Sequence, residues 1–156
     1  MRNWIVLVLS MTACWTSPDP VLVQLSASTE LANQGEKAFS EGRYNAAIEA
    51  FVKARALSPN NPNLALWQAK TAAESGDNEM AVAVLDELIQ TPAGAGLQVV
   101  HHNRAAYLMR MGRDNQAIVS LAHAHRRGLV DPEMVVNDPD FKSLQEQGVL
   151  QFMNLR

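Results

Sequence analysis

The chain has 156 residues, of which 47% are hydrophobic and 19% are charged, a composition typical of a globular protein with a core of its own. The formal net charge of −3 at pH 7 argues against a nucleic-acid-binding protein, which carries a concentrated basic surface. The single cysteine excludes an internal disulfide.

A short apolar segment opens the chain. One positive charge, Arg2, precedes an almost wholly apolar stretch over residues 4–11. This stretch is too short to span a bilayer, which takes about 20 helical residues, but it suits the core of a secretion signal. The tetrapeptide Met-Thr-Ala-Cys that ends at Cys14 resembles the lipobox of bacterial lipoproteins. The resemblance implies a signal peptide over residues 1–13 and a lipid on Cys14. The alternative is an ordinary signal, or a buried apolar stub with an incidental cysteine.

Residues 14–27 are expected to hold the lipidated cysteine and a tether. Pro18 and Pro20 lie in this stretch, among serine and threonine, and it has no helical period. A flexible tether of about 13 residues spans about 20 Å, which would keep the domain close to a membrane. In Gram-negative lipoproteins an aspartate after the cysteine tends to retain the protein in the inner membrane. Trp15 stands there, so the resemblance implies the cell envelope, at the periplasmic face of the outer membrane.

A pattern of small residues then recurs at intervals of 34 and 36 residues. Its clearest members are Ala47, Ala81 and Ala117, and Gly42, Gly76 and Gly112. Such a period indicates stacked helical hairpins, none of which buries its apolar face alone. We expect hairpins over residues 28–61, 62–97 and 98–128, with a two-residue insertion near Gly94 and with Asn61 and Pro62 starting the second hairpin.

The small residues have a packing reason. Helices of a hairpin approach to about 8–10 Å, and their closest crossing admits little more than glycine or alanine. Phe51, Leu85 and Leu121 keep the same intervals and are expected to fill the space beyond the crossing.

The first hairpin resembles the tetratricopeptide repeat, and the other two resemble it more loosely. The matching positions are Gly35, Ala38, Gly42, Tyr44, Ala47, Ile48, Phe51, Ala54 and Pro59. The resemblance implies an all-α fold, a right-handed superhelix of three helix-turn-helix hairpins followed by a C-terminal capping helix.

Residues 129–156 are interpreted as that helical cap. Asp138 followed by Pro139 is typical of a helix start, and the helix is expected to run to about Gln147. Leu144, Val149, Leu150 and Phe152 are apolar enough to pack on the last hairpin. A solenoid requires such an atypical end to cover its exposed edge.

The resemblance also implies a concave groove lined by the first helix of each hairpin. The predicted groove residues are Asn33, Glu36, Phe39, Ser40, Trp67, Lys70, Glu74, Asn103, Ala106, Met109 and Arg110. Trp67, Lys70 and Glu74 are three and four residues apart and share one helix face, which suits a bound helix or extended peptide. The alternative is that Trp67 packs between neighbouring helices.

One subclass of groove is not expected here. Tetratricopeptide domains that bind chaperones hold a C-terminal carboxylate with lysines, asparagines and an arginine. The corresponding positions are Ala32, Glu36, Trp67, Val99 and Asn103, and Glu36 would repel a carboxylate.

The histidines do not form a metal-binding pattern. His101 and His102 are adjacent and point about 100° apart on a helix. His123 and His125 are also poorly placed together, and all four histidines are expected instead to form a mildly basic patch with Arg126 and Arg127 that strengthens at acid pH. The chain carries no nucleophile elbow, phosphate loop or His-Glu metal motif. We therefore expect no enzyme, catalytic residue, cofactor, metal or small-molecule substrate.

Together these features predict a lipid-anchored scaffold or adaptor of the bacterial envelope. Its partner would be a protein or peptide in the groove, its membrane contact the lipid on Cys14, and it would bind no nucleic acid. The alternative is a structural subunit of an envelope assembly that self-associates through its ends and has no groove ligand.

Overall fold

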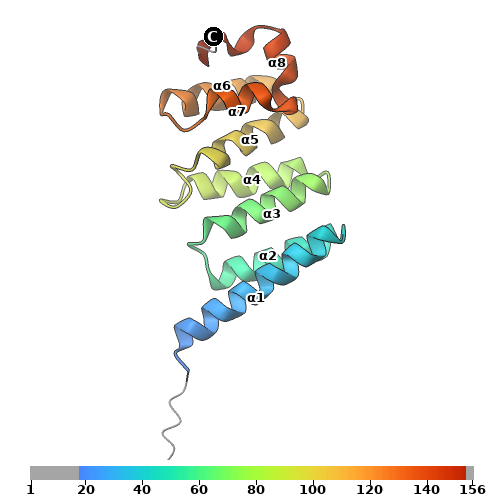
Figure 1. Cartoon of the computed structure of the whole chain (residues 1–156), viewed down its shortest axis with the longest axis vertical. Helices are drawn as coiled ribbons and strands as arrows, with labels where there is room; N and C mark the ends of the chain where they lie inside the picture. Colours follow the sequence, from blue (N-terminus) through green and yellow to red (C-terminus); the bar gives the residue numbers. More distant parts are fainter. Residues whose placement is uncertain (1–17, 154–156) are drawn as a thin grey trace, which may run out of the picture.

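The computed structural model describes residues 18–153, and every regular element in that range is helical (Figure 1). The elements are α1 (Pro20–Ser40), α2 (Tyr44–Leu57), α3 (Pro62–Glu74), α4 (Asn78–Ile89), α5 (Gln98–Arg110), α6 (Asp114–Arg126), α7 (Pro132–Asn137), η1 (Pro139–Phe141), α8 (Lys142–Glu146) and η2 (Val149–Met153). The expected signal peptide, Cys14 and the side chain of Phe152 lie outside the described residues.

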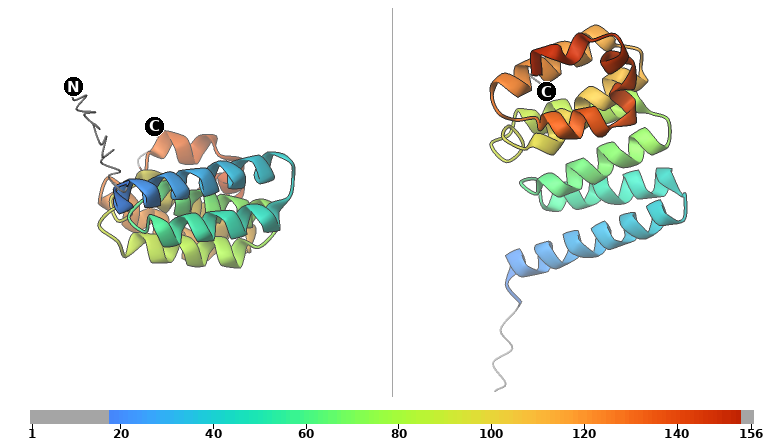
Figure 2. Two further views of the ribbon diagram at one scale, coloured as in Figure 1. Left: turned by 90° about the horizontal axis from the view of Figure 1, so that it is seen from below. Right: turned by 45° about the horizontal axis from the view of Figure 1, so that its top comes forward.

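Six helices form three hairpins that are stacked in chain order, α1 with α2, α3 with α4 and α5 with α6. Each of these helices packs on its neighbours in the chain, within its hairpin and across to the next one. The view along the stack in Figure 2 shows the hairpins lying over one another. The all-α arrangement of three consecutive helical hairpins is therefore confirmed.

The repeated glycines end the first helix of each hairpin. Gly42, Gly76 and Gly112 have φ angles of 72°, 91° and 67°, a left-handed conformation that glycine adopts without steric cost. In the first turn, the Gly42 N–H donates to the Phe39 carbonyl and the Arg43 N–H donates to the Ala38 carbonyl, each at 2.9 Å. The chain can therefore reverse within a few residues and start the second helix.

The predicted close crossings are also present. Ala47, Ala81 and Ala117 are fully buried, and so are the larger residues four positions later: Phe51, Leu85 and Leu121. Gly35 shows how tight the first crossing is, because a Cβ atom there would lie 2.7 Å from the Phe51 ring.

Helix α1 begins earlier than expected and corrects the predicted tether. Residues 20–27 are helical, and the Asp19 carboxylate caps the helix by accepting the Val21 N–H at 2.8 Å. Pro20 occupies the first turn, as Pro62 does in α3. Asp19-Pro20 is thus the same start signal as Asn61-Pro62, although two prolines in a polar stretch are also typical of irregular chain.

The extension of α1 leaves apolar side chains exposed at its first turns. Val21, Leu22, Val23 and Leu25 are 50–67% exposed. Further along, the Ser28 hydroxyl donates to the Ala54 carbonyl at 3.0 Å, which ties the helix to α2. Across residues 18–153, no helix combines the length and apolarity needed to cross a membrane.

The C-terminal cap consists of several short elements instead of a single capping helix. Pro132 and Pro139 each start a new turn, and Gly148, with a φ angle of 68°, ends α8. Val135, Phe141, Leu144 and Leu150 are buried against the last hairpin and join the core of the second and third hairpins. Short helices separated by turns therefore cover the end of the last hairpin, where a single capping helix was expected.

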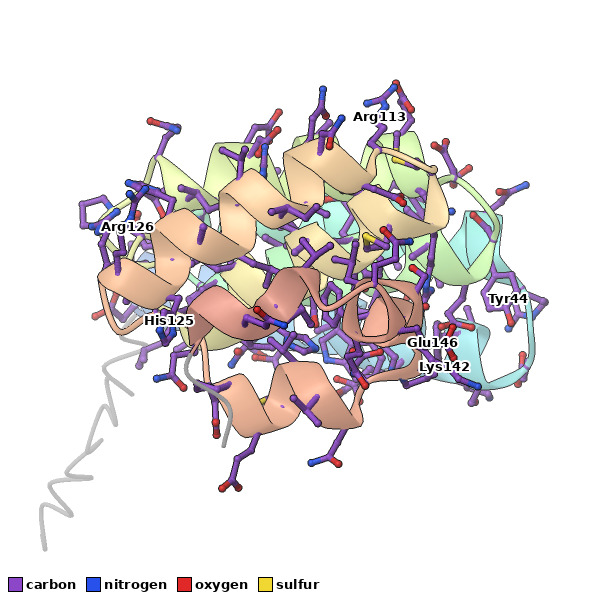
Figure 3. All side chains as sticks on the ribbon, turned by 90° about the horizontal axis from the view of Figure 1, so that it is seen from above. Tyr44, Arg113, His125, Arg126, Lys142 and Glu146 are labelled. Carbon is purple, nitrogen blue, oxygen red and sulfur yellow. The ribbon has the colours of Figure 1, made fainter. Side chains whose placement is uncertain are left out.

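Both ends of the stack carry charged side chains. On the cap, Lys142 and Glu146 lie 3.8 Å apart and are exposed (Figure 3). At the other end, a shallow hollow on α1 and α2 includes Lys37, Glu49 and Lys53. These charges limit how readily another hairpin could continue the stack.

Tyr107 gives the fold a measurable response to alkaline pH. Its ring is buried on α5, and burial raises the pKa of its hydroxyl to about 12. An unfolded tyrosine ionises near pH 10, so the stabilisation that the neutral phenol provides is complete below pH 10 and is lost as the pH rises toward 12. Tyr107→Phe should remove the late step in the tyrosinate absorbance titration. Tyr44→Phe, the control at the only other tyrosine, should leave that step in place.

Candidate binding groove

A hollow lies along the first helices of the three hairpins. Its volume is about 560 Å³. The residues that reach it from these helices are Ala32, Asn33 and Glu36 of α1, Leu64, Leu66, Trp67 and Lys70 of α3, and Val99 and Asn103 of α5. Equivalent positions of successive hairpins thus meet in one cavity, because the hairpins are stacked in register.

Five of the predicted groove residues line this cavity. They are Asn33, Glu36, Trp67, Lys70 and Asn103. The repeat intervals place Asn33, Trp67 and Asn103 at the same position of their hairpins, which is why the sequence could locate them. The five positions that hold the carboxylate clamp in chaperone-binding domains line the same cavity here, and Glu36 provides a negative charge there.

Three further predicted residues, Phe39, Ser40 and Glu74, are not part of the cavity lining. Phe39 is half-buried, and its ring centroid is 5.5 Å from that of Trp67. Ser40 is exposed at the end of α1 and donates to the Lys37 carbonyl at 2.8 Å. Glu74 is exposed at the end of α3.

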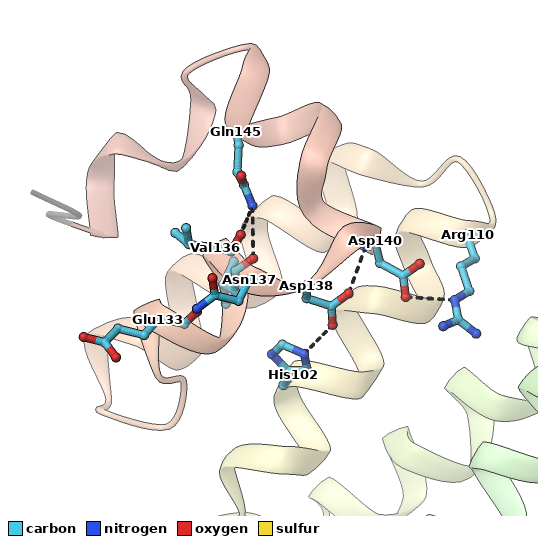
Figure 4. A network of polar contacts seen from close by, with 9 residues as sticks. His102, Arg110, Glu133, Val136, Asn137, Asp138, Asp140 and Gln145 are labelled. Carbon is cyan, nitrogen blue, oxygen red and sulfur yellow. Dashed lines mark hydrogen bonds and ion pairs between the residues drawn. The ribbon is translucent and has the colours of Figure 1, made fainter.

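The three predicted residues from the second half of α5 do not line this cavity. Ala106 is buried in the core, and half-buried Met109 packs against that core. The Arg110 guanidinium forms an ion pair with Asp140 of η1 at 2.8 Å (Figure 4). The reason is the cap, because η1 packs on α5 and removes this end of the helix from the groove.

Trp67 has both of the roles that the sequence left open. Its ring stacks on that of buried Phe51, with 5.7 Å between ring centroids and 11° between planes, and meets the Phe39 ring edge-on. The same side chain lines the groove. Trp67 therefore packs on the core and also presents an aromatic surface to the cavity.

Lys70 lies over the aromatic residues of this wall. Its Nζ atom is 4.9 Å from the ring centroid of Trp67 and 5.1 Å from that of Phe39, within the range of cation–π attraction. Within residues 18–153, no carboxylate oxygen forms an ion pair with Lys70. Among the cavity-lining residues, the charged ones are Glu36 and Lys70.

The sequence reasoning missed part of the groove wall. Leu25, Thr29, Asn61 and Asn63 also line the cavity. Thr29, Asn63 and Val99 are themselves related by the intervals of 34 and 36 residues, so the register could have identified them. Leu25 could not be found that way, because it lies in the segment that was interpreted as tether.

The histidine expectation is corrected as well. His101 and His102 are both buried and cannot form a basic patch with Arg126 and Arg127. The Nε2 atom of His102 lies 2.7 Å from the Asp138 carboxylate, and that of His101 lies 3.0 Å from the Ala95 carbonyl (Figure 4 shows the first contact). In the part of the chain that the structure describes, no three metal-ligating side chains come together.

Comparison with known families agrees with this arrangement. Residues 38–95 match the model of the tetratricopeptide repeat family. This part of the chain, from the end of α1 through α4, is thus similar to a tetratricopeptide repeat, a type of domain that generally mediates protein–protein interaction and is typically non-enzymatic, and the helix pairs pack as tetratricopeptide hairpins do. No match was found among curated proteins or among solved structures.

Proposed function

We propose that the protein is a lipid-anchored scaffold of the bacterial envelope that binds another protein or peptide segment through the groove defined above. The observation that carries this proposal is the convergence of the first helices of all three hairpins on one cavity. The cavity offers an aromatic surface, two opposite charges and several asparagine amides, a mixture typical of peptide recognition.

The groove can be tested with a matched pair of valine substitutions. Val99 lines the cavity and is 39% exposed, whereas Val119 lies on α6, is 67% exposed and does not line it. Val99→Glu should abolish recovery of the partner from an envelope extract, because it puts a larger, negatively charged side chain on the apolar part of the groove wall. Val119→Glu, with the same chemical change, should recover the same proteins as the wild type. Identical partner lists from all three folded proteins would refute a groove ligand.

The anchor is proposed from the lipobox resemblance at Cys14, which lies outside the described residues. The exposed apolar turns of α1 support it. Val21 follows Cys14 by seven residues, so even a fully extended chain keeps these turns within about 25 Å of the lipid. Cys14→Ser should release the protein from the membrane fraction. A variant that stays fully bound to membranes would contradict the anchor.

The alternative, a subunit that self-associates through its ends, has less support. The hollow at the N-terminal end and the surface of the cap both carry charged side chains. Light scattering decides between the two, because an oligomer that survives dilution would favour the alternative.

A further inference from the structure

The cavity lining holds one cationic side chain, Lys70, and one anionic side chain, Glu36, and aromatic rings hold the lysine in place. Lys70 Nζ lies about 5 Å from two ring centroids, which fixes the ammonium over the wall formed by Phe39 and Trp67. The two aromatic contacts hold the ammonium at a defined place on this wall, where a carboxylate of a ligand can form a charge-assisted hydrogen bond with it. Since no described carboxylate forms an ion pair with Lys70, this position remains open for a ligand.

The polar groups along the groove favour an extended ligand over a helical one. Asn33, Asn63 and Asn103 reach the cavity from α1, α3 and α5, and their side-chain amides make no hydrogen bond with another described residue. An amide both donates and accepts hydrogen bonds. An extended segment leaves its own N–H and C=O groups available for such bonds, whereas a helix uses most of them internally.

Apolar surface lies beside the charge. Leu66, Trp67 and Val99 line the same cavity, and Leu25 extends this surface at the N-terminal end of α1. A ligand that contacts only Lys70 and the amides would leave these side chains exposed to water. The groove therefore suits a ligand with one apolar anchor next to an acidic side chain.

We propose that the groove takes an extended segment of a partner protein, with a side-chain carboxylate of aspartate or glutamate on Lys70 and a neighbouring apolar side chain on the wall of Leu66, Trp67 and Val99. This inference rests on the proposed function and names the chemistry of its partner.

The experiment is a selection with a phage-displayed library of random twelve-residue peptides on the full chain. Wild-type protein should enrich peptides with an acidic residue at a fixed distance from an apolar one. Lys70→Glu should instead enrich peptides with a basic residue at that place. Lys53→Glu makes the same charge change on α2, away from the groove, and should return the wild-type consensus.

The effect of the Lys70 contact on affinity is then measured with one enriched peptide by fluorescence anisotropy. Its affinity should fall about tenfold with Lys70→Glu and recover when the acidic residue of the peptide is replaced by lysine. Added salt should weaken the wild-type pair. Circular dichroism checks that the variants are folded, as expected for a change at an exposed side chain.

The outcomes separate the inference from the proposed function. Groove-dependent peptides that bind Lys70→Glu as tightly as the wild type overturn the carboxylate contact and leave the groove function standing. Peptides that are helical when bound overturn the extended mode. A selection that enriches nothing, or only peptides that Val99→Glu still binds, overturns the proposed function and the inference with it.

Discussion

Replacement of Phe51 by alanine should lower the free energy of unfolding by about 3–5 kcal/mol, the range for truncation of a fully buried aromatic side chain. Phe51 has no exposed surface, and its ring stacks on Trp67 at 5.7 Å. The loss should lie in the upper part of this range because Gly35 has no side chain that could fill the space. Denaturant unfolding followed by circular dichroism measures the effect.

The neighbouring residue provides the control. Val52 is the next residue of α2, is 47% exposed and faces away from the crossing. Val52→Ala should therefore change the free energy of unfolding by less than about 0.5 kcal/mol. If Phe51→Ala cost no more than Val52→Ala, the first crossing would not be the packed contact described here. Phe51→Ala should also weaken groove binding, because Trp67 would lose the surface against which it stacks.

The hairpins could be predicted because they depend on local spacing. Gly42, Gly76 and Gly112 occupy a backbone conformation that few other residues adopt, and each marks a turn independently of the rest of the chain. Likewise, the alanines at the helix crossings reflect a steric limit that recurs in every hairpin. Once two hairpins are in register, the third is found by the same pattern after an interval two residues longer.

The groove could be predicted only as far as the repeat alone determines it. Asn33, Trp67 and Asn103 line it because stacking brings equal positions together. Ala106 and Arg110 keep the same intervals, but the cap covers their half of α5, and Asp140 pairs with Arg110. That contact joins residues 30 positions apart and has no signature in the repeat. The C-terminal cap, which is not part of the repeat pattern, therefore sets the end of the groove on α5.

The length of α1 shows a different limit. Asp19-Pro20 begins a helix for the same reason as Asn61-Pro62, but only the second pair lies at a predicted repeat boundary. Without the boundary, a proline in a polar stretch is equally typical of a loop. The distinction depends on whether the following residues find a helix to pack against, and Gln24 and Ser28 do so by donating to carbonyls of α2.

The loop between the second and third hairpins should be the most sensitive turn of the chain to a single added methyl group. A Cβ atom at Gly94 would lie 2.2 Å from the carbonyl oxygen of Leu88 and 2.7 Å from its carbonyl carbon. Both are backbone atoms near the end of α4, so no side-chain rotation can make room. We therefore expect Gly94→Ala to lower the free energy of unfolding by about 3 kcal/mol, at the upper end of the cost of overpacking.

Gly96→Ala is the matched control for this prediction, since a Cβ atom there would meet nothing within 4 Å. The two variants lie in the same loop and lose the same glycine freedom in the unfolded chain, so the difference between their unfolding free energies isolates the steric contact. Equal stabilities would contradict the close approach of this loop to α4. A large difference would show that the two inserted residues are folded back onto the second hairpin, and that the third hairpin stays in register despite the longer interval because the loop absorbs the insertion.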